Sequence, residues 1–438
     1  MGIIKFIYFM CGQLGIMLLA RFFFQWLIDF YSQGLPGING EALLSVTLVG
    51  AVLLGFRIFD GVTDPIAGTL SDIWVKRGRQ RRSLLWFTAP LPALGLILCF
   101  LPNAGHSPEV RWIILVLGLL LFFVGYTLYA IPYWSLIGDY AQGDEKRRSR
   151  LSTLLGLGLL IATAIGFVIT PNLIDRYSYL NSAFLIALLS VPLMIAPYFA
   201  MPHSDIENSF DHSDEATTHT ESLETQLKNL IMVLRHRRFI SVICLFAGSQ
   251  MSFTIMTAAA PFIASDLLGG QKSDVALILG PLLAVAIPCS ALIPTLGRKL
   301  GWEKAVVWSC LALACVYLGV GGLGVDLIGS PLMTASILFA LGGPMIAVLL
   351  GLEGEAISVC AQEQELGIGI YFGVYNLIVK GANGLAIGLT AVLAEQARAG
   401  DPWQVKLMGI SAGSMLFLGL LAYLIFKPRS ASSKVLDH

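Results

Sequence analysis

Arg57, Asp60 and Asp64 lie close together in an otherwise apolar stretch of the sequence. Residues four apart share a helix face, so the two carboxylates stack, and Arg57 neutralises part of their charge. Two carboxylates in a low dielectric resist double ionisation unless a cation joins them. Carboxylates suit hard cations, and the Thr63 and Thr127 hydroxyls could add neutral oxygens. The pattern predicts a site for Na⁺ or a proton, with a structural salt bridge as the alternative.

Four charged residues at the ends of apolar stretches are candidates for a cytoplasmic gate. Asp72 and Arg79 belong to one basic turn, and Arg147 lies in a connection that carries both signs of charge. Glu355 follows Glu353 in the stretch GLEGEA. A gate network is our interpretation of Asp72, whereas a solvated surface is favoured for Arg147. Either role suits the two glutamates.

Aromatic and amide side chains could line a cavity between the helices. Tyr126, Tyr129 and Trp134 lie in one apolar stretch, and Gln250 and Asn376 lie in two others. Rings of this kind stack on a sugar face or an alkyl chain, although an aromatic belt at the membrane interface is the alternative. The amides could contact a solute or form hydrogen bonds between helices.

Two further cations, Arg21 and Lys380, also lie within apolar stretches. The planar Arg21 guanidinium could bind a carboxylate or phosphate of the substrate; its alternative is an ion pair with Asp29 or with another helix. Lys380 and Arg57 together balance the two carboxylates of the predicted ion site. Binding of Na⁺ or H⁺ would leave one excess positive charge. Lys380 must then move towards an anionic substrate group or lose its proton.

The composition identifies the elements that hold these residues as membrane helices. The 438-residue chain is 56% hydrophobic and 13% charged, whereas soluble domains carry roughly 25% charged residues. At ~20 apolar residues for each span, the length allows about twelve transmembrane helices. We therefore expect an all-α polytopic membrane protein.

Composition also argues against several other classes of protein. The 28 basic and 28 acidic residues give zero net charge, so no basic field for nucleic acid is expected. The six histidines lie in polar connections or at the terminus, and the seven cysteines form no C-x-x-C pair. We expect no cofactor beyond a coupling ion, Na⁺ or H⁺, with Asp60 and Asp64 as the metal ligands if the ion is sodium.

Twelve apolar spans and one long polar segment define the expected organisation. The spans are 6–28, 42–71, 83–102, 112–138, 152–174, 181–201, 239–265, 275–296, 305–325, 332–352, 367–395 and 407–426. The polar segment divides the chain into an N-terminal six-helix half (1–202), a cytoplasmic linker (203–237), a C-terminal six-helix half (238–427) and a cytoplasmic tail (428–438). With both termini inside, 20 of the 28 Lys and Arg residues lie in inner loops and 5 in outer loops. This bias predicts cytoplasmic termini.

Three sequence motifs together resemble the glycoside–pentoside–hexuronide:cation symporters, the melibiose-permease-like branch of the major facilitator superfamily. They are R-x-x-D-x-x-x-D-P-x-x-G from Arg57, Y-T-x-x-x-I-P-Y-W-S-L from Tyr126, and V-K-G around Lys380. The resemblance implies a major facilitator fold. It also implies that Asp60, Asp64 and Thr127 bind Na⁺, Li⁺ or H⁺ beside Lys380.

The sequence departs from that family where its members bind sugar. Two aspartates of sugar-binding members are replaced, one by Ala130 and one by an apolar residue near Ile16, and the fifth-span arginine has no counterpart. Thr63 stands where sodium-using members commonly carry Asn, so the choice between Na⁺ and H⁺ stays open. Related lysophospholipid transporters have more apolar cavities.

These observations together predict a secondary active transporter. We expect cation-coupled symport of a small, glycoside-like organic solute by alternating access in the cell membrane, a bacterial inner membrane, with the protein acting as a monomer. An amphipathic or anionic substrate such as a lysophospholipid is the alternative. An ion channel or intramembrane enzyme is disfavoured, because the sequence shows neither a repeated pore ring nor a His/Glu metal motif.

Overall fold

A computed structural model describes most of the chain, and within the described ranges the regular elements are all helical. These ranges are 3–33, 42–142, 144–200, 232–324, 329–362, 368–398, 401 and 403–427. Most of the predicted linker 203–237 and the whole predicted tail 428–438 lie outside the described residues.

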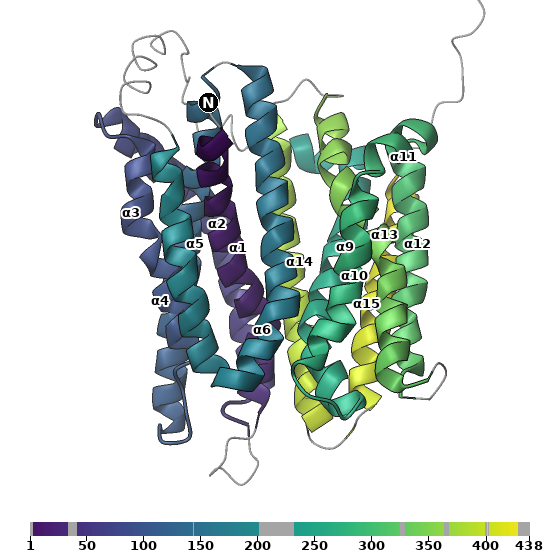
Figure 1. The fold of residues 1–438 in the computed structure, drawn as a ribbon. Coiled ribbons are helices and arrows are strands. Elements are labelled where there is room, and N and C mark those ends of the chain that lie inside the picture. The colour runs from purple at the N-terminus through teal and green to yellow at the C-terminus, as the bar shows by residue number, and fades with distance from the viewer. Residues whose placement is uncertain are drawn as a thin grey trace, which may run out of the picture.

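The first half of the chain forms helices α1 to α6 (Figure 1). Their bounds are α1 Ile3–Ser32, α2 Val46–Lys76, a 3₁₀ turn Arg81–Ser83 leading into α3 Leu84–Thr88 and α4 Pro90–Cys99, α5 Pro108–Ala141, and α6 Glu145–Ile195 followed by a 3₁₀ turn Ala196–Phe199. Within α6, Ser178 has non-helical backbone angles (φ 72°, ψ 168°). The element therefore consists of two helical arms, as the separate spans 152–174 and 181–201 predict.

The second half contains helices α9 to α15. Their bounds are α9 Arg237–Phe262 with a π-helical turn Ile263–Leu267, α10 Asp274–Ser290, α11 Ile293–Leu300, α12 Trp302–Leu318 with a 3₁₀ turn Gly319–Gly322, α13 Pro331–Gln362, α14 Ile368–Arg398 and α15 Trp403–Phe426.

Ten helical stretches in the described ranges are long and apolar enough to cross a membrane. One of them, Lys146–Phe199, contains the break at Ser178, and α10 is a shorter apolar helix. Counting the two arms and α10 separately gives twelve crossings, so the predicted all-α polytopic architecture is confirmed. Several helices are longer than predicted. The largest difference is in α13, which continues ten residues beyond the predicted end at residue 352, through Glu353, Gly354 and Glu355 and the neutral segment ISVCAQ.

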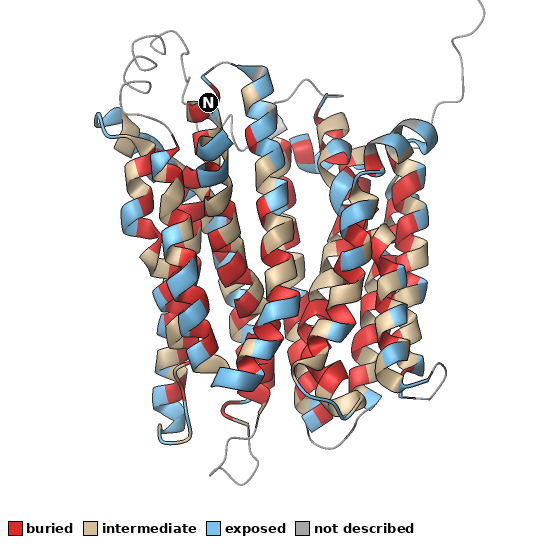
Figure 2. Ribbon diagram, viewed as in Figure 1, coloured by how far each residue is buried: buried red, intermediate tan, exposed pale blue. Residues whose placement is uncertain are grey.

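The helices form two bundles that lie side by side, with α14 at their boundary (Figure 1). Figure 2 shows buried and exposed stretches alternating along the helices of both bundles. Many exposed side chains are large and apolar, including Leu117, Leu188 and Leu421. Such faces suit lipid rather than water. We call the end where α1 begins the N-terminal face and the other end the opposite face.

Helix α2 of the first half packs against α14 of the second half through small residues. A Cβ atom added at Gly61 would lie 2.7 Å from Leu377 Cδ1, and one at Gly384 would lie 2.8 Å from Leu54 Cδ1. Small residues let membrane helices approach closely. This contact brings Lys380 on α14 opposite the charged stretch of α2.

Candidate functional site

Asp60 is the centre of a charged cluster between α2, α5 and α14. Its side chain is fully buried (0% exposed). Asp60 Oδ1 accepts a hydrogen bond from Thr127 Oγ1 at 2.8 Å, and Oδ2 lies 3.2 Å from Arg57 Nη1 and 3.1 Å from Lys380 Nζ. These partners come from three helices, so the carboxylate links all three.

Asp64 completes the cluster one helical turn further along α2. Its Oδ2 atom lies 2.6 Å from Lys380 Nζ, so the ammonium bridges the two carboxylates. The next residue, Pro65, lacks an N–H group, which leaves the carbonyl of Gly61 without its usual helical partner. The Lys380 ammonium lies 3.5 Å from the Asp60 backbone carbonyl, so a cation at this position would have a backbone oxygen nearby as well as carboxylate oxygens.

The other two predicted members of the ion site differ in their contacts. Thr127 contacts Asp60 directly, whereas Thr63 Oγ1 donates to the Asp60 backbone carbonyl at 3.1 Å. Arg57 packs its guanidinium over the Phe24 ring, 4.4 Å from the ring centroid. Asp60, Asp64, Arg57 and Lys380 carry no net charge together, and the Lys380 ammonium lies where a cation bound by both carboxylates would lie.

Arg21 lies apart from this cluster, at the contact between α1 and α9. Its Nε donates to Thr163 Oγ1 at 3.0 Å, and its guanidinium carbon is 5.5 Å from the centroid of the Phe253 ring. The alternative ion pair with Asp29 is wrong, because Asp29 pairs instead with Lys272 and Arg398 from the second half.

The three predicted aromatic residues do not share one environment. Tyr126 is partly accessible and stacks on Phe122. Tyr129 is fully buried, and its hydroxyl donates to the Met194 carbonyl of α6 at 2.8 Å. Trp134 Nε1 donates to Gln13 Oε1 of α1 at 2.9 Å. The last two contacts hold the first bundle together, which leaves Tyr126 as the aromatic candidate for solute contact.

The second bundle holds a separate acidic site on α13. Glu353 accepts hydrogen bonds from Gln250 Nε2 at 2.9 Å and from the Tyr375 hydroxyl at 2.5 Å. Gln250, predicted as a cavity residue, thus contacts an acid that sequence reasoning assigned to the end of a helix. Asn376 on α14 is exposed.

Three of the predicted gate residues make contacts within the first bundle, and the fourth, Glu355, lies in the second bundle. Asp72 Oδ1 pairs with Arg81 Nη2 at 2.8 Å. Arg79 lies over the Trp74 ring. Arg147 lies beside Asp144, whose carboxylate caps α6; the hydrogen bond from the Arg147 backbone N–H keeps the pKa of Asp144 below its usual value. Glu355 is exposed on α13.

A second charged cluster, which we call the Asp29 cluster, joins the two halves at the opposite face. Asp29 is fully buried (0% exposed) and lies 2.6 Å from Lys272 Nζ and 3.3 Å from Arg398 Nη2. Arg398 Nε also pairs with Asp266 at 3.1 Å, and the Tyr179 hydroxyl donates to Asp29 at 2.5 Å. The two carboxylates and two cations balance.

The sequence held only weak signals for the Asp29 cluster and for the contact between Glu353 and Gln250. Lys272 and Arg398 were counted as ordinary outer-loop cations, and Asp266 drew no attention. Their pairing depends on helix ends that are far apart in the sequence. An acidic residue near the end of an apolar span, such as Asp29, was the one available signal.

Polar contacts join the two bundles between the opposite face and the cluster of Arg57, Asp60, Asp64 and Lys380, which we call the ion cluster. Besides the Asp29 cluster, the Thr47 backbone N–H donates to Glu395 at 2.8 Å, and the Ser273 N–H donates to Asp175 at 2.6 Å. Towards the N-terminal face, a Cβ atom added at Gly138, Gly156, Gly354 or Gly373 would meet no described atom within 4 Å.

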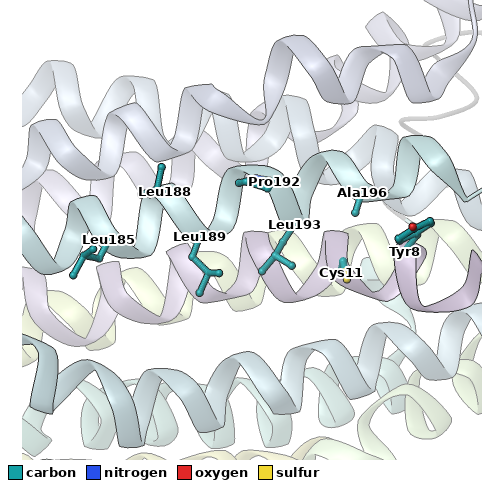
Figure 3. A pocket seen from close by; sticks show the side chains of 8 residues that line it. All are labelled: Tyr8, Cys11, Leu185, Leu188, Leu189, Pro192, Leu193 and Ala196. Carbon is teal, nitrogen blue, oxygen red and sulfur yellow. The ribbon is translucent and has the colours of Figure 1, made fainter. Parts of the chain in front are cut away.

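A groove on the membrane-facing surface does not coincide with these sites. It has a volume of about 520 Å³ and lies between α1 and the second arm of α6, lined by leucines and other mostly apolar residues (Figure 3). Tyr8 and Cys11 supply its polar atoms, and it contains none of the predicted site residues. An apolar groove on this face suits an acyl chain of the bilayer.

Two helical bundles with a buried ion cluster at their boundary define a membrane transporter. The family model for MFS/sugar transport proteins matches residues 6–425, so the chain belongs to that family. Its members are transporters rather than enzymes, as predicted.

Comparisons with individual proteins agree with this class. The chain is 28% identical over 137 residues to the uncharacterized symporter YjmB of Bacillus subtilis (strain 168), covering 31% of this chain and 29% of that one. It is 24% identical over 163 residues to YagG of Escherichia coli (strain K12), named as a glycoside/cation symporter, covering 36% and 35%. The matched segments thus span about a third of each relative.

Solved structures show the same fold. A mutant of the nucleoside transporter NupG superimposes with a TM-score of 0.63 at 14% identity, covering 96% of this chain and all of that one. The peptide transporter POT in complex with sulfate gives 0.61 at 14% identity, covering 96% and 94%. The predicted major facilitator fold is confirmed.

Proposed function

We propose that this protein is a secondary transporter that couples symport of a small organic solute to Na⁺ or H⁺. The observation that carries this proposal is the position of Lys380 Nζ, 3.1 Å from Asp60 and 2.6 Å from Asp64. An ammonium from one half of the molecule occupies the cation-binding position of the other half. The names of the two relatives as symporters support the same function.

The geometry suggests how ion binding would act on the two halves. Na⁺ or H⁺ at the carboxylates would compete with Lys380, because a second positive charge in a low dielectric is costly. The ion would therefore weaken the ion pair that joins α2 to α14. The freed ammonium would release the contact between α2 and α14, so that ion and solute bind together and the halves rearrange by alternating access.

Several further features belong to the same proposal. The excess of Lys and Arg in alternate loops supports placing the N-terminal face, the linker 203–237 and the tail in the cytoplasm, with the chain in a bacterial inner membrane. The protein would act as a monomer, with Asp60, Asp64 and Thr127 as ion ligands and no cofactor besides the coupling ion. The family description favours sugars as solutes, and the name of one relative favours glycosides.

Asparagine substitutions at the ion site test this function. In proteoliposomes, we expect the wild type to concentrate a labelled solute, chosen from glycosides and small charged metabolites, under an imposed Na⁺ or proton gradient. Asp60→Asn and Asp64→Asn should reduce this uphill uptake at least tenfold. Both should retain downhill exchange, because exchange uses the solute pocket without net ion movement.

Asp401→Asn is the matched control, because it removes an exposed carboxylate that belongs neither to the ion site nor to the gate candidates. It should retain uphill uptake. Gradient-driven accumulation by both Asp60→Asn and Asp64→Asn would show that their cluster is only structural. Replacement of Na⁺ by choline at constant pH separates sodium coupling from proton coupling.

A further inference from the structure

Arg21 is a cation without a carboxylate partner among the described residues. Its polar contact is the neutral Thr163 hydroxyl at 3.0 Å, and its flat face lies towards the Phe253 ring. Thr163 Oγ1 in turn donates to the Leu159 carbonyl at 2.8 Å, so it serves Arg21 only as an acceptor. A guanidinium has five N–H donors, and a single hydroxyl leaves most of them without a protein acceptor.

Glu353 is the complementary case in the other half of the molecule. Its carboxylate accepts hydrogen bonds from the neutral Gln250 amide and Tyr375 hydroxyl, and no Lys or Arg of the described ranges forms an ion pair with it. Glu353 lies two and a half turns or more inside α13, which ends at Gln362. It is therefore an acid within a membrane-spanning helix that lacks a counter-charge.

Both side chains lie next to the same face of α9. Arg21 contacts Phe253 and Glu353 contacts Gln250, and residues three apart on a helix are neighbours on its surface. Arg21 belongs to the first bundle and Glu353 to the second. Each remains partly accessible. The α9 residues that the positive and the negative group contact are thus about one helical turn apart.

Charges in the membrane interior are costly and usually pair with one another. The ion cluster and the Asp29 cluster both follow this rule, since each contains two carboxylates and two cations. Arg21 and Glu353 do not follow this rule of charge pairing, and both contact α9. A ligand that carries both signs of charge would satisfy both groups at once.

We propose that Arg21 and Glu353 bind the two ends of a dipolar organic solute, with its carboxylate or other anionic group at Arg21 and its ammonium group at Glu353. Gln250 and Tyr375 position the Glu353 carboxylate through their hydrogen bonds. This inference rests on the proposed transport function and specifies its solute class. The apolar, buried Ile16 and Ala130 support it, because they offer no hydroxyl-binding groups to a sugar.

A series of ω-amino carboxylates, from glycine to 6-aminohexanoate, tests this solute class. Binding is measured on the purified full chain in detergent as a rise in unfolding temperature, with no ion gradient. We expect at least one chain length to stabilise the protein in a saturable manner. Its methyl ester and its N-acetyl derivative, which each lack one charge, should bind at least tenfold more weakly.

Two neutral variants assign the ends of the solute. Arg21→Gln should lose the preference for the free acid over its methyl ester, yet keep the preference for the free amine over the N-acetyl derivative. Glu353→Gln should show the reverse pattern. Arg21→Lys and Glu353→Asp retain the charges and should retain both preferences in part. Arg176→Gln and Glu109→Gln, at exposed positions, are the matched controls and should bind as the wild type does.

Two outcomes would overturn the inference. In one, none of the ω-amino carboxylates stabilises the wild type. In the other, Arg21→Gln and Glu353→Gln weaken all ligands equally and the double variant restores binding, which would show that the two side chains pair with each other. On the same samples, the unfolding temperature is also compared in Na⁺ and in choline, and at lower pH. Any rise in that temperature depends on Asp60 and Asp64 and not on the solute, so a failure of ion coupling is distinguished from a failure of solute binding.

Discussion

At the scale of single residues, Lys380 has the clearest physical role. Its ammonium touches both carboxylates of α2 and is only 17% exposed. The sequence alone showed that these four intramembrane charges balance, because the residue types could be read directly. The spacing of the three charged residues on α2 could also be read directly. It could not show that Lys380 lies between the two carboxylates, since that position depends on how α14 packs against α2.

Removal of the Lys380 charge should strengthen ion binding while it weakens the ion-free protein. In Lys380→Gln the carboxylates lose their internal competitor, so the apparent affinity for the coupling ion should rise at least tenfold. Breaking a buried ion pair costs about 3–5 kcal/mol, so the unfolding temperature without the ion should fall. Thermal unfolding over a range of Na⁺ concentrations, with choline as the balancing ion, and over a range of pH measures both effects.

Lys406→Gln provides the control for this experiment. Lys406 lies on α15 beside Trp403, away from the ion site. If Lys380→Gln binds the coupling ion only as tightly as the wild type does, the lysine does not compete with that ion.

At the scale of elements, the spans and their order were predictable and their packing was not. Long apolar runs between charged turns defined the helices, including the separation of the two arms of α6. The end of α13 was missed because Glu353 and Glu355 mark the end of an apolar run, whereas the helix itself continues through them to Gln362. The glycines at the α2–α14 contact were unremarkable in the sequence, because their role appears only when the two helices lie together.

The contact between α2 and α14 should depend on the size of the residue at position 50. A Cβ atom at Gly50 would overlap the Ala391 Cβ and lie 3.2 Å from Gly388 Cα. Gly50→Leu should therefore destabilise the protein by about 1–3 kcal/mol, as overpacking usually does. The midpoint of thermal unfolding in detergent measures this loss.

Gly55→Leu on the same helix separates packing from helix propensity. A Cβ atom at Gly55 meets no described atom within 4 Å, so this variant should unfold at or above the wild-type temperature. Equal destabilisation by both substitutions would argue against a tight α2–α14 contact.

At the scale of the whole molecule, two balanced charge clusters hold the bundles together. The ion cluster lies between α2 and α14, and the Asp29 cluster closes the opposite face. In the proposed transport cycle the coupling ion competes with Lys380 in the first cluster only, so the Asp29 cluster would also have to open before a solute enters from that face. We therefore expect the strength of the Asp29 cluster to set the balance between the two open states of that cycle.

Asp29→Asn should shift this balance towards the state that is open at the opposite face. The substitution removes the acceptor shared by Lys272 and Arg398. Loss of one partner from a buried pair costs about 3–5 kcal/mol, and each 1.4 kcal/mol is tenfold in an equilibrium constant. The population ratio should thus change by about a hundredfold or more. Spin labels at Glu109 and Ser330, one on each bundle near that face in a cysteine-free background, should show a longer distance component.

Asp401→Asn tests whether loss of any carboxylate at that face has the same effect. Asp401 is exposed and accepts the Trp403 N–H at 3.1 Å rather than joining the bundles. Its variant should keep the wild-type distance distribution. If Asp29→Asn also keeps that distribution, the bundles are held at the opposite face mainly by helix packing. In that case the two cations find other partners, and the ion cluster alone would control the exchange between the two open states.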